Sequence, residues 1–167
     1  MVDWIIEPFG KAHDRSAFTC GMPSLDDFIR TRSSQYEKRR LGKTFVVVSK
    51  GKKLVIGYYT LAAGAVRFEH LPTEASRKLP KHPIPVILLA RLAVDQSAQG
   101  KRLGEGLLLD AFQRSLDLSG NLGAHAVEVN ALDDSAAAFY VKYGFTPLLD
   151  NPKHLYLPLA TIEKVLG

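Results

Sequence analysis

A short turn of small and basic residues, Gln99–Gly104, carries the first chemical signal in this sequence. It follows an apolar segment, Ile84–Val94, that is typical of a buried central strand, and it precedes an amphipathic helix expected from Gly104 to Leu118. At such a junction unpaired backbone N–H groups converge, the helix dipole adds positive potential and glycine permits close approach. The stretch therefore predicts a phosphate-binding turn, with an ordinary strand-to-helix connection as the simpler alternative.

Spacing separates this turn from two common phosphate-binding motifs. A P-loop ending at Gly42-Lys43-Thr44 fails because Glu37 occupies the position of its first glycine. The dinucleotide-binding fingerprint also fails, since Gly100, Gly104 and Gly106 stand at the wrong intervals. The phosphate group expected here thus belongs to another class of ligand.

The second chemical signal lies in the helix expected after Asp133-Asp134-Ser135. Helical spacing places Ala136, Phe139, Tyr140 and Tyr143 on one face. An aromatic stripe of this kind usually belongs to the core, and that interpretation suits Phe139 and Tyr143. A tyrosine phenol, with an ordinary pKa of about 10, also stays protonated at neutral pH and can donate a proton.

Together the two segments resemble the GNAT acetyltransferase superfamily. Gln99–Gly104 is similar to its acyl-CoA pyrophosphate loop, Gln/Arg-x-x-Gly-x-Gly/Ala, although Arg102 stands where the middle glycine is usual. Phe139-Tyr140 followed by Gly144-Phe145 is similar to the closing motif, in which the tyrosine lies beside the CoA sulfur. The departure at Arg102 puts the tight turn in question but retains the backbone donor and adds a cation.

The resemblance implies acetyl-CoA as co-substrate and direct attack of a neutral amine on the acetyl carbonyl. Tyr140 would protonate the leaving thiolate as general acid. The other implied contacts are with the cofactor: main-chain groups for the pantetheine arm (Leu92, Ala93, Val94), the pyrophosphate loop (Gln99, Gly100, Lys101, Arg102, Leu103, Gly104) and the thioester side (Asn130, Ala136, Phe139).

A narrower resemblance, to the GNAT-type toxins of type II toxin–antitoxin systems, covers nearly the whole chain. It is carried by Phe18–Phe28, Arg91–Asp95 and Asn130–Phe145. This resemblance implies acetylation of the α-amine of aminoacyl-tRNA, a block of translation, a small DNA-binding antitoxin and a homodimer. Basic side chains expected at the tRNA backbone are Arg30, Lys38, Arg39, Arg40 and Arg91, with a solvated helix face as the simpler explanation for most of them.

The sequence offers no evident general base. The carboxylates Asp95, Glu105, Asp133 and Asp134 are explained as turn or cap residues. An aminoacyl ester needs little help because its amine has a low pKa, whereas a lysine side chain titrates near 10.4. Acetylation of a small amine, or of a protein lysine or N-terminus, remains an alternative, as does a non-catalytic regulator that binds acyl-CoA or nucleic acid.

The elements that must position these residues predict a mixed α/β fold. We expect a mostly antiparallel sheet, splayed at the acetyl-CoA site and flanked by helices. The expected strands are Trp4–Pro8, Thr44–Ser49, Lys53–Ala65, Ile84–Val94, His125–Asn130, Phe145–Leu148 and His154–Leu157. The expected helices begin at Ser24, Ser33, Gly104 and Asp133, with a helical turn at Thr73–Lys78 inside a substrate-side loop.

Composition bounds the class of protein. With 167 residues, 46% hydrophobic and 23% charged, the chain is expected to form one globular domain, 1–167. A single cysteine, Cys20, excludes an internal disulfide, and five histidines without ligand spacing predict no metal. The N-terminus lacks a signal-peptide pattern and no apolar run is long enough for a membrane span, so a cytoplasmic protein is expected. The net charge of +5 favours anionic partners.

Overall fold

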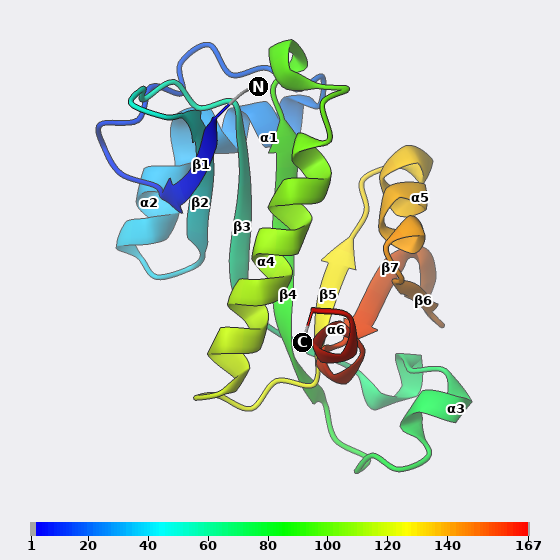
Figure 1. The fold of residues 1–167 in the computed structure, drawn as a ribbon. Helices are drawn as coiled ribbons and strands as arrows, with labels where there is room; N and C mark the ends of the chain where they lie inside the picture. The colour runs from blue at the N-terminus through cyan, green and yellow to red at the C-terminus, as the bar shows by residue number, and fades with distance from the viewer. Residues whose placement is uncertain (1–2, 167) are drawn as a thin grey trace. The chain divides into compact units, whose positions relative to one another are not determined.

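The computed structural model describes residues 3–166, which form a mixed sheet accompanied by helices (Figure 1). Its strand order is β1-β2-β3-β4-β5-β7-β6. The strands are β1 (Trp4–Pro8), β2 (Lys43–Ser49), β3 (Gly57–Val66), β4 (Ile84–Val94), β5 (Ala126–Asn130), β6 (Thr146–Leu148) and β7 (Asn151–Pro158). β4 and β5 pair in parallel, whereas β1/β2, β2/β3, β5/β7 and β6/β7 are antiparallel. The expected mixed, mostly antiparallel α/β fold is confirmed.

The helices lie between the strands in the expected order along the chain. The longer elements are α1 (Pro23–Asp27), α2 (Ser33–Lys38), α4 (Leu103–Ser119), α5 (Asp134–Lys142) and α6 (Leu159–Leu166). A π-helical segment, η1 (Phe28–Arg32), joins α1 to α2, so the chain is helical from Pro23 to Lys38. Short turns complete the set: η2 (Phe68–His70), α3 (Thr73–Ser76) and η3 (Gln96–Ala98). None of the helices within residues 3–166 has the length and apolarity that crossing a bilayer requires.

Two of the sequence-based boundaries were wrong for a local reason. Ser24 does not cap α1: Met22 is the N-cap residue and Pro23 occupies the first helical position, where its missing N–H costs nothing. β3 begins at Gly57 rather than Lys53, because the preceding segment pairs with Asp14. Asp14 N donates to Lys53 O at 2.8 Å and Val55 N donates to Asp14 O at 2.9 Å.

The C-terminal helix α6 was missed altogether. It follows β7 without a loop, which removes the usual turn signal. Its apolar face buries Leu159 and Ile162, and Leu159 N donates to His125 O at 2.9 Å. Tertiary packing and this one hydrogen bond define a helix that local sequence signals leave ambiguous.

The chain divides into two compact units. One comprises the residues up to Ala62 together with Leu89–Ala111, and the other comprises Ala63–Leu88 together with the residues from Phe112 onward. The assignment of 1–167 to a single domain stays a prediction.

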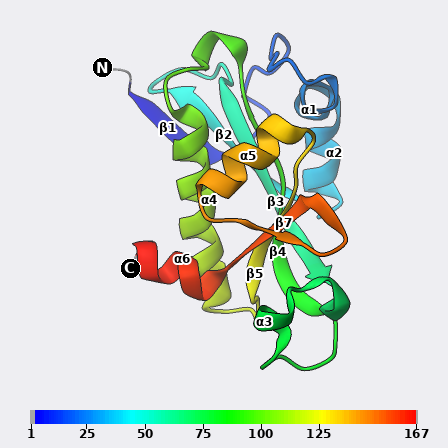
Figure 2. The same ribbon diagram turned by 90° about the vertical axis from the view of Figure 1, so that its right-hand side faces the viewer.

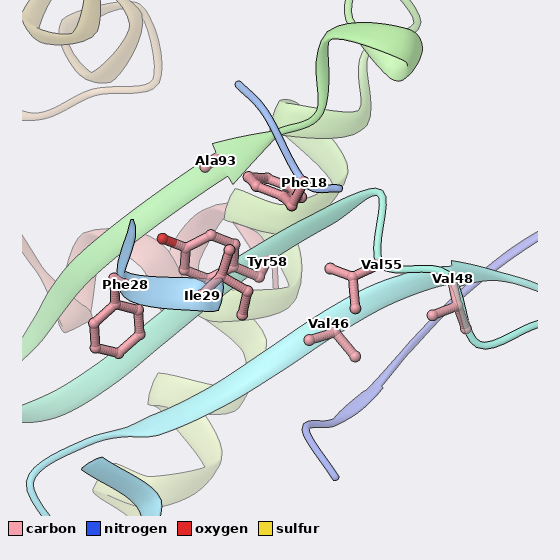
Figure 3. Packing of buried hydrophobic residues seen from close by; sticks show 8 residues of the cluster. All are labelled: Phe18, Phe28, Ile29, Val46, Val48, Val55, Tyr58 and Ala93. Carbon is pink, nitrogen blue, oxygen red and sulfur yellow. The ribbon is translucent and has the colours of Figure 1, made fainter. Parts of the chain in front are cut away.

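The first unit buries an aromatic and aliphatic cluster beneath α1 and η1. Figure 3 shows this cluster, which contains Phe18, Phe28, Ile29, Val46, Val48, Val55, Tyr58 and Ala93. Tyr58 is fully buried and its hydroxyl donates to Leu25 O at 2.6 Å, so the ring packs while its polar end is satisfied. Helix α4 packs closely at Gly57, where an added Cβ would lie 3.2 Å from Leu107 Cδ1.

The second unit buries another cluster, against which the segment between β3 and β4 packs. Figure 2 shows this segment with α3. Its buried members are Val66, Leu71, Ile84, Val86, Ala126, Leu148 and Tyr156. Ala75 and Leu79, in and after α3, pack against them. The segment between β3 and β4, which the sequence predicted to be a substrate-side loop, therefore covers the sheet of this unit.

Replacing Leu107 by Ala is expected to destabilise the protein strongly. Its side chain is fully buried, and removal leaves a cavity beside Gly57. The expected loss in the free energy of unfolding is about 2–5 kcal/mol, measured by urea denaturation. Leu122→Ala is the control, because that side chain is 65% exposed and should change stability by less than about 0.5 kcal/mol. Equal effects of the two changes would contradict the packing described here.

Candidate active site

The turn between β4 and α4 has the tight geometry that the sequence left in question. Gly100 has a φ of 82° and Arg102 a φ of 62°. Arg102 therefore adopts the left-handed conformation that glycine favours, at a cost of roughly 1–2 kcal/mol for a residue with a side chain. The first hydrogen bond of α4 runs from Gly106 N to Arg102 O, at 3.2 Å. Helix geometry gives the N–H groups of Leu103 and Gly104 no acceptor earlier in α4, so they can bind an anion.

Side chains brace this turn against the segment Phe18–Met22. Asp95 Oδ1 accepts from Thr19 N at 2.8 Å and Asp95 Oδ2 accepts from Ser97 N at 3.0 Å. Gln99 Nε2 donates to Cys20 O at 3.0 Å and to Val94 O at 2.9 Å. The Gln99 side chain is thus a brace within the turn, a role that sequence spacing did not reveal.

The carboxylate of Asp95 is held ionised by these contacts. Burial by itself would raise its pKa, but the hydrogen bonds from Ser97 and from the Thr19 N–H outweigh it, so the pKa is lowered. The expected role of Asp95 as a turn residue is confirmed, because it caps η3.

The strand end that would face a pantetheine arm lies directly before this turn. Leu92 and Val94 are half-buried and Ala93 is buried in the first cluster. Lys101 and Arg102 are exposed, and Leu103 is buried as the first residue of α4. The first unit therefore brings together all nine residues expected on the pantetheine and pyrophosphate side, within a single strand–turn–helix.

The basic side chains expected at RNA occupy different environments. Lys38, Arg39 and Arg40 are exposed around the end of α2, where Arg40 has a φ of 58°. Arg91 is half-buried, and its guanidinium lies 3.7 Å from the centre of the Phe28 ring and 5.2 Å from that of Tyr36. Arg30 is exposed, although its Nη2 donates to Phe18 O. These contacts suffice to explain Arg30 and Arg91 structurally, whereas the other three are open to solvent.

In the second unit, β5 leads into α5 through a capped turn. Asn130 is exposed at the end of β5, and Asp133 Oδ1 accepts from Ala136 N at 2.8 Å. The predicted Asp133 cap is confirmed. Because this hydrogen bond occupies the Ala136 N–H, only the small Ala136 side chain is left to line a ligand.

Tyr140 lies inside an aromatic group on α5 and the residues after it. Its ring centre is 5.3 Å from that of Phe139 and 5.3 Å from that of Phe145, and Phe139 lies 5.1 Å from Tyr143. Tyr140 is 8% exposed, whereas Phe139 and Tyr143 are half-buried. Burial raises the pKa of Tyr140, so its phenol is protonated and can donate a proton at any physiological pH.

The second unit also contains a cluster of ionisable groups that the sequence did not reveal. Glu128 Oε2 lies 2.5 Å from His154 Nε2, and Asp150 Oδ2 lies 2.9 Å from His154 Nδ1. His70 Nδ1 lies 3.8 Å from the same carboxylate oxygen of Asp150. The available signal was a charged residue inside the apolar run Ala126–Val129, since a charge in a buried strand requires partners.

His154 holds this cluster together as a cation. Burial by itself would lower its pKa, but hydrogen bonds to Glu128 and Asp150 outweigh that effect and raise the pKa. For Asp150, burial acts to raise the pKa, but the hydrogen bond from His154 prevails and lowers it. Two carboxylates thus flank one imidazolium.

Cys20 carries a half-buried free thiol. Burial raises the pKa of its thiol to about 11, and Sγ lies 3.7 Å from Met22 O. Residues 3–166 contain no group of three or more His, Cys, Asp or Glu side chains arranged to hold a metal ion.

The structure thus contains the strand–turn–helix and the buried tyrosine that the sequence motifs predicted. Residues 41–147 match the family model described as "Acetyltransferase (GNAT) domain". The chain therefore belongs to the GNAT acetyltransferases, as its sequence motifs implied.

Individual relatives narrow the comparison. The chain is 39% identical over 156 residues to a tRNA-acetylating toxin of Mycobacterium tuberculosis, which covers 93% of this chain and 92% of the relative. A structure of AtaT complexed with acetyl-methionyl-tRNAfMet superposes with a TM-score of 0.92 at 29% identity, covering 99% of this chain and 100% of that one. A mutant AtaT toxin bound to acetyl-CoA and the C-terminus of the antitoxin AtaR gives a TM-score of 0.85 at 28% identity and covers 99% of both chains.

The charged cluster predicts a pH dependence of stability. The pKa of His154 is raised above 6.5. Its contribution to the free energy of unfolding is therefore fully present below pH 6.5 and is lost as the pH rises through the folded-state pKa. Because the pKa of Asp150 is lowered from 3.8, its contribution is present above that pH and is lost on acidification through the folded-state pKa. The stability advantage of wild type over His154→Gln should therefore be largest between about pH 4 and pH 6.5 and should shrink at higher pH.

Urea denaturation at a series of pH values measures this difference. His82→Gln is the matched control, because His82 is exposed in the same unit and should give a flat difference. A His154→Gln difference that did not change between pH 6 and pH 9 would contradict the imidazolium assignment.

Proposed function

We propose that this chain transfers the acetyl group of acetyl-CoA to the α-amine of aminoacyl-tRNA and acts as a toxin that blocks translation. The observation that carries the proposal is the 39% identity, over 93% of the chain, to a tRNA-acetylating toxin. The complex of AtaT with acetyl-methionyl-tRNAfMet, at 29% identity over nearly the whole length, supports the same class of substrate.

In this proposal, acetyl-CoA binds to the strand–turn–helix of the first unit. The turn Gln99–Gly104 binds the pyrophosphate through backbone N–H groups, and Arg102 adds a cation. The main chain of Leu92–Val94 binds the pantetheine arm. The braces from Asp95 and Gln99 support this assignment, because a pre-formed turn loses little entropy when the anion binds.

Tyr140 is proposed as the general acid, with Asn130, Ala136 and Phe139 lining the thioester side. The amine attacks the acetyl carbonyl, the C–S bond breaks, and the Tyr140 phenol protonates the sulfur. Burial keeps the Tyr140 phenol in its protonated form, so a proton is present when the thiolate forms.

The exposed basic group Lys38, Arg39 and Arg40 is proposed to contact tRNA phosphates. Arg30 and Arg91, which also have structural contacts, are proposed to contribute to the same surface. An antitoxin that binds DNA is the proposed protein partner, and a homodimer is the proposed assembly, in the cytoplasm where aminoacyl-tRNA occurs. The AtaT complex with the C-terminus of AtaR supports the antitoxin.

Incubation with labelled acetyl-CoA tests the substrate. Wild-type protein is offered a total pool of charged tRNA and the same pool after deacylation. Label is expected on the charged pool alone, since deacylated tRNA lacks the α-amine. Sequencing of the labelled species then identifies the tRNA. Label on neither pool, with acetyl-CoA still bound in calorimetry, would reject the proposed substrate in favour of a small amine or a protein amine.

Replacing Tyr140 by Phe removes one hydroxyl and keeps the ring. We expect kcat to fall by about 10²–10⁴-fold, which is the usual range for loss of a general acid, while the Kd for acetyl-CoA changes little. Tyr143→Phe, on the same helix, is the control and should retain activity. Unchanged turnover in Tyr140→Phe would remove this phenol from the mechanism.

A further inference from the structure

Glu128 is a carboxylate buried in the middle of an otherwise apolar strand. It is 7% exposed, between Val127 and Val129, which are 1% exposed. Its Oε2 is paired with His154 Nε2, whereas no residue in the described part of the chain donates a hydrogen bond to Oε1. One oxygen of a buried carboxylate is therefore fixed and the other is open to a further donor.

The position of Glu128 in the sheet is informative. In the parallel register of β4 with β5, Leu88 pairs with Glu128 as the last of three pairs. Glu128 is two residues before Asn130, so both side chains project from the same face of β5, roughly 7 Å apart along the strand. Asn130 is the residue that the proposed function assigns to the thioester side, so Glu128 lies one step deeper along the same face.

The backbone opposite makes room for the open oxygen. An added Cβ at Gly64 would lie 3.0 Å from Glu128 Oε1 and 3.2 Å from Val86 Cγ2. A Cβ at position 64 would require the Glu128 carboxylate to shift by a few tenths of an ångström. The φ angle of Gly64 is not positive, so other residues could adopt its backbone conformation. The close approach of Glu128 therefore accounts for glycine here.

The groups packed around Glu128 connect it to the surface. His154 and Asp150 form the chain described above, in which the Asp150 side chain is 30% exposed and that of His70 is 32% exposed. Tyr156, directly opposite Glu128 on β7, is buried, and burial raises its pKa, so it is neutral. With one imidazolium between two carboxylates, the assembly carries a net negative charge suited to a substrate ammonium.

We propose that Glu128 is the proton acceptor for the substrate amine, and that His154, Asp150 and Gly64 position its carboxylate. This inference rests on the proposed function, because it places the acceptor amine at the face of β5 that carries Asn130. It supplies the general base that no carboxylate in the sequence suggested.

The proton balance is complete without a further reactant. The acceptor enters as an ammonium with three N–H protons and leaves as an amide with one. One of the two displaced protons is accounted for by the thiol of CoA, which Tyr140 protonates. Glu128 takes the two protons that leave nitrogen in turn and passes them to water; one of them restores the Tyr140 phenol, so that one proton is released overall as the C–N bond forms and the C–S bond breaks.

The pH dependence of kcat/KM in Glu128→Gln tests the proposal. The amide keeps the shape of the side chain and can still accept a hydrogen bond from His154, but it cannot take a proton. With charged tRNA as acceptor, we expect a loss of about 10²-fold or more near pH 6.5 that narrows as the pH rises and the free amine becomes abundant. The Kd for acetyl-CoA should be unchanged.

Two further variants separate chemistry from folding. Glu74→Gln is the matched control, since its side chain is 87% exposed in the same unit; it should follow the wild-type profile. Asp150→Asn retains Glu128 but removes one hydrogen-bond partner of His154. Its loss of kcat/KM should be smaller than that of Glu128→Gln and should also decrease as the pH rises. A loss in Glu128→Gln that is equal at every pH, or no loss, would overturn the proposal and leave the cluster a structural ion pair.

Failure of the proposed function would be seen separately. If wild-type protein does not label charged tRNA, the substrate assignment has failed, and the Glu128→Gln profile is then measured with whichever amine the wild type acetylates. If the loss of kcat/KM in Glu128→Gln becomes smaller as the pH rises with that amine, the result supports Glu128 as proton acceptor. If the pH profiles of wild type and variant are parallel, the result rejects it.

Discussion

The turn that begins α4 depends on one carboxylate, Asp95. Its two oxygens accept from different parts of the chain: Oδ1 from Thr19 N and Oδ2 from Ser97. Gln96 N returns a bond to Thr19 O at 2.8 Å, and Gln99 adds another to Cys20 O. The N-terminal segment and the end of the central strand are thereby tied at a point where neither has regular structure. Without these bonds the turn would have to be ordered at the moment when it binds the proposed pyrophosphate.

Arg102 shows how a motif can survive a change in its sequence. The superfamily pattern has glycine at this position, and the left-handed backbone at Arg102 reproduces what glycine would adopt. Hydrogen bonds on both sides of Arg102, from Gln99 and in the first turn of α4, offset the conformational cost. A motif defined by residue types alone therefore misses turns whose backbone conformation is fixed by neighbouring residues.

Local signals in the sequence predicted β4, α4 and the Asp133 cap, because hydrophobic periodicity and capping chemistry act within a few residues. They also predicted which residues gather at the turn and on α5. What they could not predict required pairing in space. Glu128, Asp150 and His154 meet only because β5 and β7 lie antiparallel, with Asn130 opposite His154. The helix α6 and the side-chain role of Gln99 were missed for the same reason, since each is defined by a distant partner.

Gly64 and Glu128 are separated by more than sixty positions in the chain, yet they share one small volume. A residue with a side chain at 64 requires the carboxylate at 128 to shift away from its position, and a larger side chain requires a larger shift. The two positions should therefore drift through evolution as a pair: lineages that keep the acid keep the glycine, and lineages that lose the acid are released to fill the space.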